Sequence, residues 1–300
     1  MMQYKTQFTV EGATLTGFFH RPDNSDTTSL SPIIVMGNGF ATEWQFGTQK
    51  IVEAFVAAGF STLNFDYRGF GGSEPQCNDP RQVVDTQAQL NDWRAAIQHA
   101  MQQSWVDSKK LVLWGSSLGG GHCITMASEF KEVACAVAQV PHCCSRAAFK
   151  VVSMSSVLTG MSRGIKDVIG AKFGREPILL PVVAEPDNYG VMNYPGWKSH
   201  YYEIAANSPT WENAIPARSL LRAGDYRPIE SAKLVECPML IVAGKQDAGV
   251  PFAAIENTLK NLKQGELCAY EGDHFEVYHG HKQAELIQTE VAFIQKHVKA

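Results

Sequence analysis

Short apolar runs alternate along the chain with segments whose apolar positions recur at helical spacing. Short apolar, β-branched runs are typical of strands, and a 3.6-residue spacing is typical of amphipathic helices. The strands predicted in this way cover residues 6–10, 14–20, 33–36, 61–65, 110–114, 133–140, 237–243 and 266–270. The predicted helices cover residues 49–58, 81–103, 118–130, 252–261 and 284–298.

This alternation predicts an α/β fold with a doubly wound, mostly parallel β-sheet that helices cover on both faces. The first two strands meet at the Glu11-Gly12 turn and are expected to form an antiparallel hairpin. Ligands bind such sheets at the carboxyl ends of the strands. Four Gly-containing polar segments follow predicted strands, so we expect them to gather at one edge: GNGF, DYRGFGGS, GSSLGG and AGKQDAG.

The alternation breaks between residues 144 and 236, where prolines punctuate an irregular stretch. So long an excursion inside a compact domain is usually functional, often as a lid. We therefore expect an α/β core in residues 1–143 and 237–300, and an inserted, mainly helical cap in residues 144–236. A small packing subdomain away from the strand ends is the alternative. The expected cap is rich in aromatic residues: Tyr189, Tyr194, Trp197, Tyr201, Tyr202 and Trp211.

Composition narrows the class of protein. A chain of 300 residues, 45% of them hydrophobic, can bury a sizeable core. A net charge of −4 and a pI near 6.1 give no electrostatic case for nucleic acid or an anionic membrane. No apolar stretch approaches the roughly 18 residues of a membrane span, and no signal peptide is recognisable, so we expect a cytoplasmic protein. Seven cysteines without a CxxC pair favour reduced, mostly buried thiols over disulfides or a zinc site.

A candidate nucleophile lies in the segment Gly115-Ser-Ser-Leu-Gly119. The pattern G-x-S-x-G fits only with Ser117 at its centre, because position 114 is Trp. In this motif the serine sits on a strained strand-to-helix turn, and the flanking glycines press against neighbouring backbone. The start of the following helix favours a negative oxygen nearby. A predicted strand and helix flank the motif here; a Gly-rich turn without chemistry is the alternative.

A serine at its ordinary pKa needs a general base, and the base needs an orienting acid. Downstream, Asp247 follows the predicted strand MLIVAG and His274 follows the predicted strand ELCAY. The interval between them fits one helix and one strand. Two backbone N–H groups are expected to form an oxyanion hole. We assign them to Leu118, next to the serine, and to Phe40 in the GNGF loop.

Three other carboxylates are weaker candidates for the acid. Asp273 adjoins His274 and is badly placed to orient it, and Asp225 lies in the expected cap. Asp66 is expected to tie its own loop together through Arg68 or backbone groups.

Other histidines and cysteines suggest no second chemistry. His279 and His281 are a possible fragment of a metal site, but no carboxylate or cysteine at ligand spacing completes it. His122 and Cys123 follow the serine turn and are interpreted as packing residues or supports of that turn. We therefore expect neither a metal nor an organic cofactor.

Taken in order, GSSLGG, DYRGFGGS, the acid of AGKQDAGVP and the histidine of GDHFEVY resemble the α/β-hydrolase superfamily. The resemblance runs from about residue 5 to residue 298, apart from the cap. Within that superfamily the sequence is similar to dienelactone-hydrolase-like and X-Pro-peptidase-like branches, and to fungal relatives assigned to polyketide acyl transfer. The resemblance implies Ser117 as nucleophile, Asp247 as acid, His274 as base, and Phe40 and Leu118 as oxyanion donors.

The sequence departs from the pattern of that superfamily at two places. The oxyanion loop commonly reads His-Gly, whereas this chain has Asn38-Gly39. Dienelactone hydrolases proper use a cysteine nucleophile and haloalkane dehalogenases an aspartate, so Ser117 argues against both reactions.

These observations predict a serine hydrolase, esterase-like, that cleaves an ester, thioester or activated amide through an acyl-enzyme. Acyl transfer with the same residues, a cofactor-free perhydrolase or lyase, and a non-catalytic binding protein are the alternatives. The apolar cap favours a small-molecule substrate with an apolar acyl or alkyl group, although the same residues could pack shut on themselves. No basic cluster marks an anchor for a peptide, and an exposed cap could form a homodimer.

Overall fold

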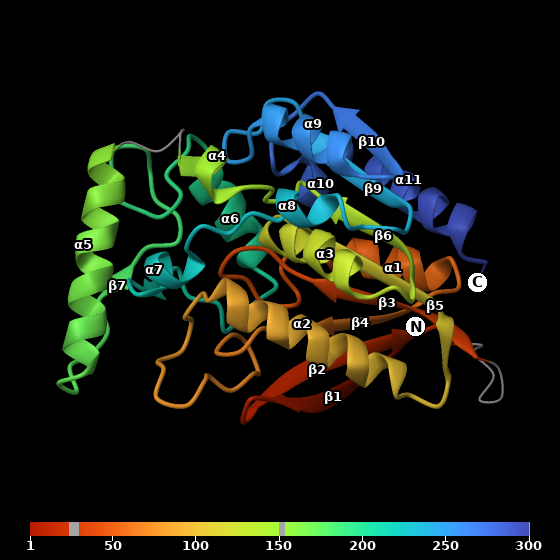
Figure 1. Ribbon diagram of the computed structural model, residues 1–300, viewed down its shortest axis with the longest axis horizontal. Helices are drawn as coiled ribbons and strands as arrows, with labels where there is room; N and C mark the ends of the chain where they lie inside the picture. The colour runs from red at the N-terminus through yellow and green to blue at the C-terminus, as the bar shows by residue number, and fades with distance from the viewer. Residues whose placement is uncertain (24–29, 150–153, 300) are drawn as a thin grey trace.

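The computed structural model describes residues 1–23, 30–149 and 154–299. An eight-stranded sheet in the order β1-β2-β4-β3-β5-β6-β9-β10 runs through the molecule (Figure 1). Its strands are β1 (Met2–Val10), β2 (Ala13–Arg21), β3 (Ser31–Gly37), β4 (Ser61–Phe65), β5 (Val106–Ser116), β6 (Val133–Gln139), β9 (Met239–Gly244) and β10 (Gly265–Tyr270). Strand β2 pairs antiparallel with β1 and β4, and all pairs from β4 to β10 are parallel. The predicted fold class and the antiparallel hairpin are confirmed.

Helices cover both faces of the sheet because the central strands are apolar on both sides. In β3, Ile33 and Val35 belong to one buried cluster, whereas Ile34 and Met36 belong to a second. Five helices that pack on the sheet contribute side chains to these two clusters. The first cluster contains side chains of α2 (Thr86–Met101), α3 (Leu118–Glu129) and α9 (Phe252–Asn261), and the second those of α1 (Gln49–Ala57) and α11 (Gln283–His297).

Three elements begin four or five residues away from the start that the hydrophobic pattern predicted. Strands β1 and β5 begin four residues earlier than predicted, since residues 2–5 of β1 pair with β2 and Val106 of β5 pairs with Ser31 of β3. Helix α2 was predicted from residue 81 but begins at Thr86, where the Asp85 side chain accepts the N–H groups of Gln87 and Ala88. Just before it, Val84 is buried in a loop and donates its N–H to Ser219 Oγ at 3.0 Å.

The segment between β6 and β9 lies over one end of the sheet and contains most of the short elements. They are α4 (Ser145–Phe149), α5 (Met154–Ala171), β7 (Leu179–Leu180), α6 (Trp197–Ala205), β8 (Ile215–Pro216), α7 (Ser219–Ala223) and α8 (Ile229–Ala232). In Figure 1, α5 stands at the left edge of the molecule. The antiparallel β7–β8 pair was not predicted, and α8 packs against α3 and α9 of the sheet layer. Residues 150–153 of the expected cap lie outside the described residues.

One side of α5 is apolar and exposed, including Met154, Leu158 and Ile169. The homodimer expected from the sequence stays a prediction. Among the described residues, no helix combines the length and the apolar character that crossing a bilayer requires.

A carboxyl group is buried in the apolar layer between the sheet and α11. Glu290 is fully buried, and its Oε2 accepts the Trp114 Nε1–H at 2.9 Å. Burial raises the pKa of Glu290 to about 8, and the hydrogen bond from Trp114 opposes this rise only in part. The folded chain therefore keeps a proton that the unfolded chain releases near pH 4.5. This contribution to stability is complete below that pH and is lost as the pH rises to about 8.

We expect Glu290→Gln to remove this pH dependence, because the amide has the shape of the protonated acid and does not titrate. Between pH 5 and pH 8 the free energy of unfolding of the wild type should fall by about 3 kcal/mol relative to the variant. Urea unfolding of both proteins across this range measures the difference, in which all other titrating groups cancel. Parallel pH curves would show that Glu290 is ionised in the folded chain.

Candidate active site

Ser117 is the single residue between β5 and α3. Its backbone has φ 56° and ψ −118°, a conformation that is sparsely populated for a residue with a side chain. Strand β6 and the residues after it hold this turn in place. The Ser117 N–H donates to the Gln139 carbonyl at 2.9 Å, and the Ser117 carbonyl accepts the His142 N–H at 2.8 Å.

The two glycines of the motif lie so close to neighbouring backbone atoms that a side chain at either position would overlap them. A Cβ on Gly115 would lie 2.1 Å from the Gly119 carbonyl oxygen, and a Cβ on Gly119 would lie 2.3 Å from the Gly37 oxygen. Neither position can hold a larger residue without displacing backbone. The GNGF loop passes beside the serine, since a Cβ on Gly39 would lie 3.2 Å from Ser117 Cβ.

The three side chains singled out from the sequence are in contact. His274 Nε2 lies 3.2 Å from Ser117 Oγ, and His274 Nδ1 lies 2.5 Å from Asp247 Oδ2. The other carboxylate oxygen of Asp247 accepts the N–H groups of Gly249 and Val250 at 2.8 and 2.9 Å. The Asp247 carboxylate is thus held so that one oxygen faces the imidazole. Their catalytic roles remain predictions.

The neighbouring serine is placed differently. Ser116 is buried, and its Oγ lies 2.5 Å from the Tyr278 hydroxyl. The same Oγ accepts the Gln139 Nε2–H at 2.8 Å. These two contacts occupy the hydroxyl in the protein interior, which agrees with the choice of Ser117 from the motif.

The other carboxylates have partners away from the imidazole. Asp225 is on the surface and pairs with Arg146, and Asp273 accepts the Phe275 N–H at 2.8 Å. Both arrangements leave Asp247 as the carboxylate that contacts His274.

Asp66 ties its loop together through backbone groups, which is one of the two ways that the sequence led us to expect. It accepts the N–H groups of Trp44 and Gly72, and burial raises its pKa to about 7. The other route, a bond to Arg68, is wrong, because the Arg68 guanidinium pairs with the buried Asp92 instead.

The two expected oxyanion donors border the same cavity as the serine. Leu118 is the first residue of α3, so its N–H has no partner within the helix. Phe40 follows Gly39 in the loop beside Ser117. Leu118 and Phe40 both line the cavity that Ser117 and His274 also border. Their role as oxyanion donors stays a prediction.

A cavity of about 560 Å³ opens beside Ser117 and His274. Its outer walls come from α5, residues 189–197 and α7, within the segment between β6 and β9. Its apolar and aromatic lining includes Phe40, Val157, Met161, Tyr189, Val191, Met192, Leu220, Leu221, Tyr226 and Val250. None of the described residues that line it is Asp, Glu, Lys or Arg.

The sequence placed Trp197 in the expected cap and His122 beside the serine turn without indicating their contacts, and it did not single out His142. Trp197, the first residue of α6, stacks on the His274 ring with centroids 5.0 Å apart. His142 lines the cavity, and burial lowers its pKa to about 4, so it is neutral at physiological pH. The only signal for His142 was its position just after β6. His122 contacts the cavity residue Tyr226, Nδ1 to hydroxyl, at 2.8 Å.

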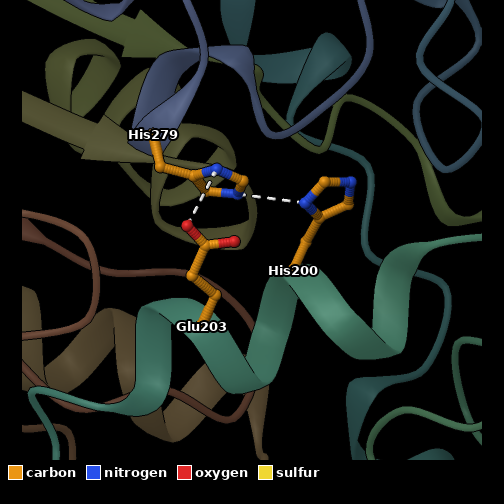
Figure 2. Close-up of side chains that lie close together, drawn as sticks. All are labelled: His200, Glu203 and His279. Atoms are coloured by element: carbon orange, nitrogen blue, oxygen red, sulfur yellow. Dashed lines mark hydrogen bonds and ion pairs between the residues drawn. The ribbon is translucent and has the colours of Figure 1, made fainter.

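His279 and His281, considered together as a possible metal-site fragment, lie in different surroundings. His281 is exposed, whereas His279 lies next to His200 and Glu203 of α6 (Figure 2). Glu203 brings to His279 a carboxylate that no ligand spacing in the sequence indicated. Glu203 is 76 residues away in the chain, a separation that spacing rules do not cover.

We expect Gly119→Ala to destabilise the fold, because the added Cβ would meet the carbonyl oxygens of Gly37 and Asn38. The cost should be about 2 kcal/mol in the free energy of unfolding, as for other overpacked sites. Gly170→Ala in α5 is the control, since its Cβ would lie no closer than 3.5 Å to a neighbour. Urea unfolding should show no loss of stability for the control. Equal stability of the two variants would contradict the close approach.

Known proteins resemble this chain along nearly its whole length. The quorum-quenching protein AidA of Acinetobacter baumannii (strain MDR-ZJ06) is 29% identical over 290 residues, which cover 97% of this chain and 93% of AidA. The polyketide transferase af380 of Aspergillus fumigatus is 23% identical over 281 residues, 90% of this chain and 91% of that protein.

Solved structures share the fold. The crystal structure of the α/β hydrolase GrgF from Penicillium sp. sh18 matches with a TM-score of 0.83 and 22% identity, covering 99% of each chain. The family model described as serine aminopeptidase, S33 (Hydrolase_4) matches residues 29–279. Together with the sheet order, this match shows that the chain belongs to that hydrolase family within the α/β-hydrolase superfamily.

Proposed function

We propose that the protein is a serine hydrolase of the esterase type, which cleaves a carboxylic ester or a related thioester or amide. The observation that carries the proposal is the chain of contacts from Ser117 Oγ to His274 Nε2 and from His274 Nδ1 to Asp247 Oδ2. A hydroxyl, an imidazole and a carboxylate in this order are the parts that nucleophilic acyl transfer requires. A non-catalytic binding protein would not need all three in contact.

In the first step of the proposed reaction, Ser117 Oγ attacks the substrate carbonyl while His274 Nε2 takes the hydroxyl proton. Asp247 accepts the Nδ1–H of the imidazole, which holds the correct tautomer and stabilises the positive charge that forms. The N–H groups of Leu118 and Phe40 donate to the oxyanion. His274 then gives its proton to the leaving group, and an acyl-enzyme on Ser117 remains.

In the second step, His274 takes a proton from water, which attacks the acyl-enzyme carbonyl. The tetrahedral intermediate collapses, the acid leaves, and Ser117 recovers its proton from His274. An alcohol or amine in place of water would give acyl transfer with the same residues. The similarity to polyketide transferase af380 supports this second candidate, and product analysis distinguishes the two.

We propose that residues 144–236 serve as a cap which selects the substrate. Side chains from this segment form the outer walls of the 560 Å³ cavity, and Trp197 of the same segment stacks on His274. An apolar cavity of this size fits a medium-sized acyl or alkyl group. Its described lining offers no carboxylate to pair with an α-amino group, which argues against an aminopeptidase reaction.

The first test is labelling with a fluorophosphonate probe, which needs no knowledge of the substrate. We expect the wild type to be labelled and Ser117→Ala to stay unlabelled, because only an activated hydroxyl attacks the probe. Ser116→Ala is the matched control: it removes the adjacent hydroxyl, which contacts Tyr278 rather than His274, and should keep most of the labelling.

Circular dichroism of the three proteins checks that each is folded. Labelling that persists in Ser117→Ala but is lost in Ser116→Ala would show that Ser116, and not Ser117, is the nucleophile. Absence of labelling in the folded wild type would contradict the proposed hydrolase.

The second test asks whether the cavity holds the acyl group. Val157 on α5 lines the cavity, so we expect Val157→Phe to shorten the space available to an acyl chain. With p-nitrophenyl esters, kcat/KM for the octanoate should fall by about tenfold or more, whereas the acetate should be cleaved as by the wild type. Val168→Phe on the same helix is the control, because Val168 is exposed outside the cavity lining. Equal losses for both esters would place the acyl group elsewhere.

A further inference from the structure

Two histidines and a glutamate from distant parts of the chain meet beside the candidate active site (Figure 2). His200 and Glu203 lie one turn apart on α6, and His279 is the last residue of α10 (Glu276–His279). His200 Nδ1 lies 3.1 Å from His279 Nε2, and Glu203 Oε1 lies 3.7 Å from His279 Nδ1. One potential ligand atom from each residue falls within 4.8 Å of the other two. The 3.1 Å and 3.7 Å separations involve opposite nitrogens of the His279 ring, so the exposed Glu203 side chain must turn toward Nε2 for all three residues to bind one ion.

We propose that His200, Glu203 and His279 form a binding site for a divalent transition-metal ion, best suited to zinc. Two imidazole nitrogens and a carboxylate oxygen are ligands that zinc accepts readily, whereas calcium and magnesium prefer oxygen alone. Zinc–nitrogen bonds of about 2.0–2.1 Å at tetrahedral angles place two nitrogens about 3.3 Å apart. The separation of 3.1 Å between the two imidazoles is close to this value. A water molecule would complete four-coordination.

Aromatic packing restrains the His200 ring before any ion binds. The His200 ring stacks on the buried Phe275 with centroids 4.8 Å apart, and the His279 ring lies 6.2 Å from the same aromatic ring. The outer nitrogen of His200, Nε2, lies 3.9 Å from Asp273 Oδ2. A carboxylate at the outer nitrogen of a ligating histidine is a common way to orient its ring and raise its basicity.

The site is open enough for an ion to enter. The side chains of His200 and His279 are 33% and 23% exposed, and that of Glu203 is 65% exposed. A direct N–H···N hydrogen bond between the two rings would also account for their distance, but it would need no ion. The two interpretations therefore differ in whether zinc binds these residues.

A bound ion would join two segments that hold His274 from different sides. Helix α6 begins with Trp197, which stacks on the His274 ring, and α10 begins two residues after His274. Tyr278 of α10 also contacts Ser116 below the turn. Zinc at this position would fasten the segment over the cavity to the segment that carries the histidine, and would stabilise the folded chain by mass action.

The test is calorimetric titration of zinc into the purified full chain after treatment with a chelator and dialysis. The wild type should bind one zinc ion at this site, and its melting temperature should rise with zinc. Loss of an orienting neighbour costs about 10–100-fold in metal affinity, so loss of a ligand in His279→Ala should cost at least about 100-fold. His281→Ala is the matched control, because it removes an exposed histidine two residues away and should bind zinc like the wild type.

Glu203→Gln provides a second ligand variant on an exposed side chain of a different helix, so a folding defect in one variant does not decide the outcome. It should also weaken binding. Equal zinc affinity of the wild type and both ligand variants would overturn the proposal, as would a folded wild type that binds no zinc. Ser117→Ala should bind zinc normally, so this result is separate from the outcome of fluorophosphonate labelling.

Discussion

The positive φ of Ser117 is the constraint on which the rest of the site depends. A conformation of this kind costs about 1–3 kcal/mol and persists only where surrounding contacts impose it. Here the carbonyl of Gln139 and the N–H of His142 hold the turn from β6, and Gly115 and Gly119 allow β5 and α3 to approach at backbone contact distance. As a result, the Ser117 hydroxyl projects from the strand end toward His274.

Two parts of the chain contribute differently to the site. The sheet and its turns supply the hydroxyl, the imidazole and the carboxylate, each within four residues of the end of a parallel strand. The segment between β6 and β9 supplies the apolar walls and the Trp197 ring that lies on His274. In the proposed function the first part sets the chemistry and the second part sets the acyl group that fits.

Local patterns predicted some elements to the residue and missed the starts of others. Strand β4 and helix α9 were predicted to the residue, because β4 is a short, fully buried strand and α9 has one apolar face at helical spacing. The start of α2 was missed, since Val84 is buried in a loop whose N–H is satisfied by a side chain 135 residues away. The start of β5 was missed because the polar residues 107–110 separate Val106, which pairs with Ser31, from the apolar run that begins at Leu111.

The sequence by itself determined the alternation of strands and helices, the glycine spacing around Ser117, and the positions of Asp247 and His274 after strands. These features are local, because each depends on residues within one turn or one strand. Only the tertiary structure decided the cavity, the stacking of Trp197 on His274, and the meeting of His200 and Glu203 with His279. Such contacts join residues far apart in the chain, and they depend on how α5, α6 and α7 pack over the strand ends, which local patterns do not specify.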